Sequence, residues 1–234
     1  MTVDIAEAPP EVRAALAVAL DVDDAIAALR LARELRPWFG VAKVGLELWS
    51  AAGPDVVGSL LDLGYEVFVD LKFHDIPTTV ERAARVVGAL GATYLNFHAQ
   101  GGVAMLRAGV EGFLAGAEGA GLPLPVPLAV TILTSEAEAP ADVLAARVDL
   151  AVDAGCGGVV CSATDVAAVK AAAPQLVAVV PGIRPLGTPT HDQARAATPE
   201  SARAAGADVL VIGRAVTQAS DPVAAAGAIA ASLS

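Results

Sequence analysis

One short stretch, residues 67–77, places acidic and basic side chains directly after a run of bulky apolar residues, in the sequence VFVDLKFHDIP. The run is typical of a buried strand, and side chains two residues apart in a strand share a face, so Asp70 and Lys72 should point the same way. Pro77 ends regular strand pairing, which leaves Asp75 on the next loop, within reach of the same pocket. An acid and a base therefore leave one strand side by side, as acid–base chemistry requires.

The same stretch could instead hold a structural ion pair, which would stabilise the fold little if it were exposed. Two observations favour a functional site. Lys and Asp are rarely buried unless they are paired, and ionisable residues at the C-terminal end of a strand in an α/β protein are disproportionately catalytic. The chain also has only three lysines, of which Lys43 and Lys72 lie in apolar, strand-like runs. We therefore interpret the stretch as part of an active site.

The apolar pattern of the whole chain predicts eight strands that alternate with helices, after an N-terminal tail of residues 1–13. The expected strands cover residues 14–20, 41–48, the stretch from 67, 93–97, 127–133, 157–161, 176–180 and 208–212. Helices are expected over about 24–35, 54–63, 79–90, 103–115, 140–154 and 164–173, and after residues 198 and 214. Continuous apolar strands favour a closed parallel barrel over an open doubly wound sheet. The predicted fold is α/β, a single (β/α)8 TIM barrel spanning residues 1–234.

Barrels of this kind carry their active sites at the C-terminal ends of the strands, so the polar residues at those ends should form one constellation. These residues are Asp21, Lys43, Asp70, Lys72, His98, Thr134, Arg184 and Arg214. Gly213 and Arg214 directly follow the eighth strand and start a helix. Backbone N–H groups, the helix dipole and a guanidinium commonly bind phosphate at this place in the fold. The sequence therefore predicts a phosphorylated substrate.

Charge and composition exclude several classes of partner. The net charge of −11 and the isoelectric point near 4.6 argue against binding to nucleic acid or to an anionic membrane. No signal peptide and no unbroken apolar stretch of roughly 20 residues is present, so a cytoplasmic location is expected. Cys156 and Cys161 are expected to be small buried core residues, because no cluster with metal-ligand spacing accompanies them.

Seven motifs together resemble the orotidine 5′-phosphate decarboxylase family along nearly the whole chain. They are LD at 20–21, KVG at 43–45, DLKFHDIP at 70–77, HA at 98–99, LTS at 133–135, PGIRP at 181–185 with Gln193, and VIGR at 211–214. The Asp-x-Lys-x-x-Asp core is shared with sugar-phosphate relatives, whereas FHDIP and PGIRP are more specific. Thr78 stands where the family often has Asn, and Thr79 is the residue that corresponds to the family's Thr.

The resemblance implies decarboxylation of orotidine 5′-phosphate to uridine 5′-phosphate without a metal or organic cofactor. Lys72 would be the cationic acid, which stabilises the carbanion left by CO2 and protonates it. Asp70 and Asp75 would flank Lys72 and favour its charged form, and Lys43 would complete an alternating row of charges. Asp70 would also lie near the departing carboxylate.

The resemblance further implies a homodimer with two shared active sites, because Asp75, Ile76 and Thr79 come from the neighbouring subunit in this family. The expected substrate contacts are Asp21 and Thr79 at the ribose, Thr134 at the pyrimidine, and Arg184, Gln193, Gly213 and Arg214 at the phosphate. Closing a loop over the phosphate could position the base and exclude water.

Several of these residues have structural alternatives. Ser135 and Glu138 also fit a capping box that would start a helix. His98 could be a core histidine, and Arg184 could pin its loop through a surface ion pair. His74 is expected to point away from the face of Asp70 and Lys72 and to be a packing or interface residue. Gly182 and Gly213 could be simple turn residues, although their positions after strands favour phosphate binding.

Three other functions compete with decarboxylation. A sugar-phosphate enzyme with the same core would use Mg²⁺ and would need further carboxylates or a His at other strand ends. A Schiff-base aldolase would use Lys72 as a nucleophile, which the flanking acids disfavour. A non-catalytic phosphate-binding scaffold would be expected to have lost at least one of the four charged residues, Lys43, Asp70, Lys72 and Asp75.

Overall fold

Eight parallel strands close into a barrel in chain order, with the last strand paired to the first. The computed structural model describes residues 7–136, 140–185 and 197–233. The strands are Leu16–Ala19 (β1), Val41–Val44 (β2), Glu66–Phe73 (β3), Tyr94–His98 (β4), Val126–Val130 (β5), Gly158–Val160 (β6), Val177–Ile183 (β7) and Val209–Ile212 (β8). The predicted TIM barrel is confirmed.

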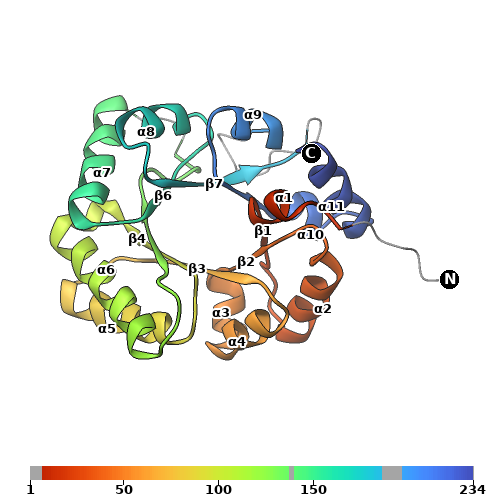
Figure 1. Ribbon diagram of the computed structural model, residues 1–234, viewed down its shortest axis with the longest axis horizontal. Helices are drawn as coiled ribbons and strands as arrows, with labels where there is room; N and C mark the ends of the chain where they lie inside the picture. Colours follow the sequence, from red (N-terminus) through yellow and green to blue (C-terminus); the bar gives the residue numbers. More distant parts are fainter. Residues whose placement is uncertain (1–6, 137–139, 186–196, 234) are drawn as a thin grey trace.

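Helices surround the barrel on its outside (Figure 1). They are Pro10–Ala14 (α1), Ala25–Leu35 (α2), Leu46–Ala52 (α3), Asp55–Asp62 (α4), Pro77–Ala89 (α5), Gly102–Gly119 (α6), Ala141–Ala154 (α7), Val166–Ala172 (α8), Pro199–Ala204 (α9), Arg214–Thr217 (α10) and Pro222–Ala231 (α11), with a short 3₁₀ turn at Ala99–Gly101. Within the described ranges, none of these helices combines the length and apolar character needed to span a membrane.

Two apolar clusters hold the barrel together. The inner cluster takes alternate residues of the strands, such as Ala17 and Ala19 of β1 and Val209 and Val211 of β8, and it includes Phe68. The outer cluster fills the space between the strands and the helices. This two-sided burial explains why the strands read as continuous apolar runs.

Some predicted boundaries were wrong. The second strand was expected to run to residue 48, but β2 ends at Val44, and α3 begins after Gly45. Residues 46–52 read LELWSAA, in which apolar and polar side chains alternate only at the start. The Leu, Glu and Ala residues of this segment favour a helix. The expected tail of residues 1–13 contains α1, which starts at a proline suited to the first helical position. The region after β8 forms two helices, α10 and α11, in place of one.

The third strand has an irregularity where the charged residues begin. Val69 pairs with Leu95 and Phe73 pairs with Phe97, so residues 70–72 lie opposite a single residue of β4. Lys72 has a φ of 51° and is the one non-glycine residue with positive φ in the part of the chain that the structure describes. The strict alternation predicted for Asp70 and Lys72 is therefore broken by a bulge.

Helices α5 and α6 approach each other closely through glycines. A Cβ atom at Gly112 would overlap the carbonyl oxygen of Glu81, and one at Gly116 would overlap the carbonyl oxygen of Arg85. On the other helix, a Cβ at Gly88 would overlap the carbonyl oxygen of Phe113. This packing fixes α5, whose first turn follows the loop that carries Asp75.

Candidate active site

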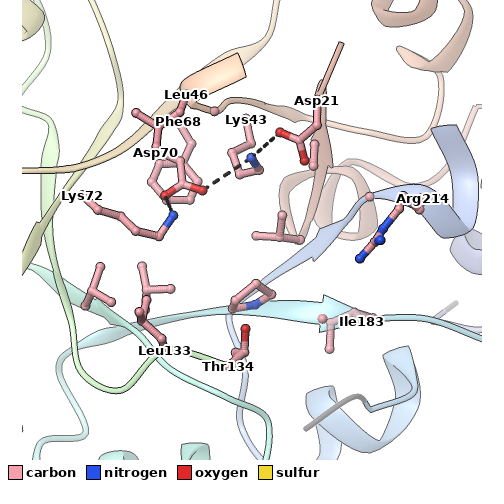
Figure 2. Close-up of a pocket in the computed structure, with 18 of the residues that line it drawn as sticks. Asp21, Lys43, Leu46, Phe68, Asp70, Lys72, Leu133, Thr134, Ile183 and Arg214 are labelled. Atoms are coloured by element: carbon pink, nitrogen blue, oxygen red, sulfur yellow. Dashed lines mark hydrogen bonds and ion pairs between the residues drawn. The ribbon is translucent and has the colours of Figure 1, made fainter. Parts of the chain in front are cut away.

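A cavity of about 340 Å³ opens at the C-terminal ends of the strands. Residues of every strand except β4, or of the loops after these strands, line it (Figure 2). The lining includes eight of the predicted site residues, namely Asp21, Lys43, Asp70, Lys72, Thr134, Arg184, Gly213 and Arg214. The cavity lies where the barrel rule placed the active site.

Four charged side chains form a continuous row along one wall of the cavity (Figure 2). Lys43 Nζ lies 2.9 Å from Asp21 Oδ1 and 3.4 Å from Asp70 Oδ2, and Lys72 Nζ lies 2.6 Å from Asp70 Oδ1. The charges therefore alternate in the order Asp21, Lys43, Asp70 and Lys72. Each charged side chain in the row forms an ion pair with its neighbour, and buried charged groups need such partners.

Burial and pairing act in opposite directions on the two central groups. Lys43 is only 7% exposed, and burial alone would lower its pKa, but Asp70 and Asp21 outweigh burial and hold the pKa above its usual value. Burial alone would raise the pKa of Asp70, but Lys43, Lys72 and a hydrogen bond from Asn96 hold it below its usual range. Both groups are therefore charged at neutral pH.

Asn96 is a site residue that the sequence interpretation missed. It lies in the middle of β4, is fully buried, and donates from Nδ2 to Asp70 Oδ1 at 2.7 Å. Its Oδ1 accepts from the backbone N–H of Lys72 at 2.8 Å. A carboxamide inside the apolar run of a central strand was the available signal, because buried polar side chains are uncommon.

The opposite side of the cavity carries residues predicted to hold the phosphate and the pyrimidine. Arg214, predicted at the phosphate, reaches toward the cavity from the start of α10, and Thr134, predicted at the pyrimidine, lies on the loop after β5 (Figure 2). Gly213 and Arg184 also belong to the lining. The backbone N–H of Arg184 donates to the carbonyl of Ala197 at 3.0 Å, so Ala197 lies beside the end of β7. Gln193 lies outside the described residues.

Three predicted residues do not line the cavity. Asp75, Ile76 and Thr79 are exposed, and Ile76 retains 66% of its accessible surface. Asp75 Oδ1 accepts from the backbone N–H of Ile76 at 2.6 Å, at the entry to α5. One chain therefore does not bring these three side chains to the charged row.

The two histidines near the site pack against each other. The rings of His74 and His98 lie 5.6 Å apart at a tilt of 41°. Burial, followed by the nearby charges of His74, Lys72 and Arg147, lowers the pKa of His98. His74 is exposed, and neither ring belongs to the cavity lining. His98 is half-buried at the end of β4, so it is not a fully enclosed core residue.

The two cysteines and the possible capping residues lie outside the charged row. Cys156 and Cys161 are both buried, as expected for core residues, and burial raises the pKa of the Cys156 thiol to about 12. Ser135 is exposed, and its possible capping partner Glu138 lies outside the described residues. Among the residues described, no three His, Cys, Asp or Glu side chains gather into a group that could hold a metal ion.

Comparison with known proteins gives a consistent result along the chain. The sequence profile of the orotidine 5′-phosphate decarboxylase / HUMPS family matches residues 14–229. The orotidine 5′-phosphate decarboxylase of Anaeromyxobacter sp. (strain K) is 49% identical over 93% of this chain and 97% of its own. That of Moorella thermoacetica is 46% identical over 92% of this chain and 90% of its own.

A solved structure extends this likeness to three dimensions. The crystal structure of orotidine 5′-phosphate decarboxylase from Lactobacillus acidophilus superimposes with a TM-score of 0.76 at 36% identity, covering 92% of this chain and 96% of that chain. The profile match, these identities and the barrel with its charged row agree, and this chain belongs to the orotidine 5′-phosphate decarboxylase / HUMPS family.

Proposed function

We propose that this protein decarboxylates orotidine 5′-phosphate to uridine 5′-phosphate and CO2, the last step in the de novo synthesis of that nucleotide, and that it needs no metal or organic cofactor. The observation that carries the proposal is the row Asp21, Lys43, Asp70 and Lys72 on one wall of a cavity that Arg214 enters from another side (Figure 2). The relatives named above support the choice of substrate.

The row suits the charge changes of this reaction. When the bond between ring carbon C6 and the carboxylate breaks, CO2 leaves and the electron pair remains on C6. The Lys72 ammonium stabilises this carbanion and then transfers a proton to C6, and the resulting amine regains a proton from water. Asp70 holds Lys72 Nζ at 2.6 Å, so the acid is in place before the bond breaks.

The remaining residues bind and orient the nucleotide. Lys43 and Asp21 lie at the ribose end of the row, Thr134 contacts the pyrimidine, and Arg214, Arg184, Gly213 and Gln193 bind the phosphate. These phosphate contacts are remote from the bond that breaks. Binding energy from a remote group can orient the base and exclude water, so the loss of Arg214 should lower kcat as well as raise KM.

A homodimer completes each site in this proposal. Asp75, Ile76 and Thr79 of a second copy would reach the cavity, with Asp75 beside Lys72 and Thr79 at the ribose. Their exposure on the single chain, including the apolar side chain of Ile76, supports this assignment. The cytoplasmic location and the absence of nucleic acid partners stay predictions from charge and composition.

The test is the ultraviolet absorbance change of orotidine 5′-phosphate on addition of the purified protein in EDTA. We expect rapid conversion by the wild type and a loss of roughly 10²- to 10⁴-fold in kcat for Lys72→Ala. Lys170→Ala is the matched control, because Lys170 forms an ion pair with Asp208, which directly precedes β8 at the opposite end of the barrel. Its activity should equal that of the wild type.

No conversion by well-folded protein would overturn the proposal. A metal-dependent sugar-phosphate enzyme would then become the leading alternative. Conversion of orotidine 5′-phosphate that occurs without EDTA and stops in EDTA would contradict the claim that no metal is needed. Equal losses for Lys72→Ala and Lys170→Ala would contradict a catalytic role of Lys72.

A further inference from the structure

Asn96 is placed where β3 and β4 lose their regular pairing. In an unbroken register, Asp70 would lie opposite Asn96 and Leu71 opposite Phe97, but Phe73 takes the place opposite Phe97. Two extra residues of β3 are therefore accommodated beside Asn96. Backbone groups released from a ladder need other partners when they are buried.

The Asn96 carboxamide supplies one such partner. Its Oδ1 accepts from the backbone N–H of Lys72 at 2.8 Å, and Lys72 is the residue with the left-handed φ of 51°. A lysine adopts this backbone conformation only where its surroundings enforce it. The hydrogen bond that Lys72 N–H donates to Asn96 is one such restraint, because it fixes the peptide group between Leu71 and Lys72.

The other end of the same carboxamide restrains Asp70. Asp70 Oδ1 accepts from Asn96 Nδ2 at 2.7 Å and from Lys72 Nζ at 2.6 Å, and Oδ2 faces Lys43 Nζ at 3.4 Å. Only this orientation of the carboxamide gives each acceptor a donor, because a carboxylate cannot donate to an amide oxygen. Asn96 therefore binds the backbone of Lys72 and the carboxylate that holds its ammonium.

We infer that Asn96 is a positioning residue for the decarboxylation proposed above. It is fully buried and outside the cavity lining, and it acts on the reaction through Asp70 and Lys72. One side chain fixes both ends of the Lys72 residue, its backbone directly and its ammonium through Asp70. The inference rests on the proposed function and extends it to a residue that does not meet the substrate.

The first test separates binding from chemistry with Asn96→Ala. The phosphate and ribose contacts come from other strand ends, so KM should change by less than about 3-fold, whereas kcat should fall by roughly 10- to 100-fold. Tyr65→Phe is the matched control. It removes another buried side-chain hydrogen bond, from Tyr65 Oη to the carbonyl of Ala32 at 2.7 Å, just before β3 and at the other end of that strand from Lys72. This variant should keep the kcat of the wild type.

The second test uses pH and the isosteric variant Asn96→Asp, which can fold even if Asn96→Ala cannot. When the introduced carboxylate and Asp70 are both ionised they repel each other, and the donor to Asp70 is absent. When the pair holds one proton, the donor is restored, and carboxylates this close have a raised apparent pKa. The kcat of Asn96→Asp relative to wild type should therefore increase as pH falls from about 9 to about 6, whereas the ratio for Asn96→Ala should not change with pH.

Each outcome decides the inference. Equal kcat values for Asn96→Ala and Tyr65→Phe, or a kcat ratio for Asn96→Asp that does not change with pH, would overturn it while leaving the proposed function intact. If well-folded wild-type protein does not convert orotidine 5′-phosphate, the proposed function fails and this inference fails with it.

Discussion

The charged row combines burial with pairing at the level of single residues. Lys43 and Asp70 would each be unfavourable inside the barrel alone, because a buried charge without a partner costs several kcal/mol. Here each has two partners, and the net effect of pairing on both pKa values exceeds that of burial. Lys43 and Asp70 are therefore held in their charged states before any substrate arrives.

The lowered pKa of Asp70 predicts how stability depends on pH. The folded state binds fewer protons than the unfolded state near pH 3.8, the usual value for Asp, so the stability from Asp70 is present above that pH. It is lost as pH falls below 3.8 toward the folded pKa. Urea unfolding between about pH 3 and 6 should show a stability difference between wild type and Asp70→Asn that shrinks toward acid.

Asp23→Asn is the matched control for this series, because Asp23 is exposed and has the same side chain. The difference in free energy of unfolding between wild type and Asp23→Asn should stay constant between about pH 3 and 6. A difference between wild type and Asp70→Asn that is constant with pH would contradict the assigned pKa shift of Asp70.

At the level of strands and helices, local sequence patterns predicted β2 and β3 but not their exact conformations. Alternation predicted that Asp70 and Lys72 lie together, and they do, but through a bulge and a left-handed Lys72 in place of a regular strand. The backbone of the bulge donates to Asn96, 24 positions along the chain from Lys72, and a local pattern does not contain such a partner. The second strand was predicted to end at residue 48, whereas β2 ends at Val44. A few alternating residues after Gly45 fit a strand and a helix equally well, so the local pattern could not decide between them.

The crossing of α5 and α6 predicts a specific sensitivity to small side chains. A Cβ at Gly112 would overlap the backbone carbonyl of Glu81, which cannot move aside without shifting α5. We expect Gly112→Ala to lower the free energy of unfolding by about 1–3 kcal/mol. Chemical denaturation at neutral pH measures this change.

Gly58→Ala provides the control for this prediction. Gly58 lies inside α4, and nothing lies within 4 Å of the place where its Cβ would be. Alanine is the better helix former there, so stability should rise by roughly 0.5–1 kcal/mol. An increase in stability in Gly112→Ala as well as in Gly58→Ala would show that the α5–α6 contact is looser than described.

Strand order and the position of the cavity were predictable for the whole molecule, because both follow from alternating apolar runs and from the barrel rule. Eight of the predicted site residues line one cavity, although they come from six different strands and their loops. Asp75, Ile76 and Thr79 do not, and no local pattern distinguishes a residue that serves its own chain from one that serves a neighbour. Their assignment to a shared site came from the family resemblance.

A shared site predicts complementation between two inactive variants. In a hybrid dimer of Asp75→Asn and Lys72→Ala chains, one of the two sites contains both Lys72 and Asp75. Random exchange makes about half of the dimers hybrid, so about a quarter of the wild-type activity should return. The activity of mixed samples, with exchange verified by native mass spectrometry, measures this. Verified exchange without any recovery would show that Asp75 serves its own chain or neither site.

Proton transfer from Lys72 to C6 is tested most directly by running the decarboxylation in D2O and examining the product by proton NMR. The Lys72 ammonium exchanges with solvent, so we expect uridine 5′-phosphate with deuterium at ring carbon C6 and one CO2 for each molecule of product, from wild type and Lys170→Ala alike. Lys72→Ala should form this product only at a greatly reduced rate. Turnover by Lys72→Ala at the wild-type rate, or a product without deuterium at C6, would show that Lys72 does not have this role.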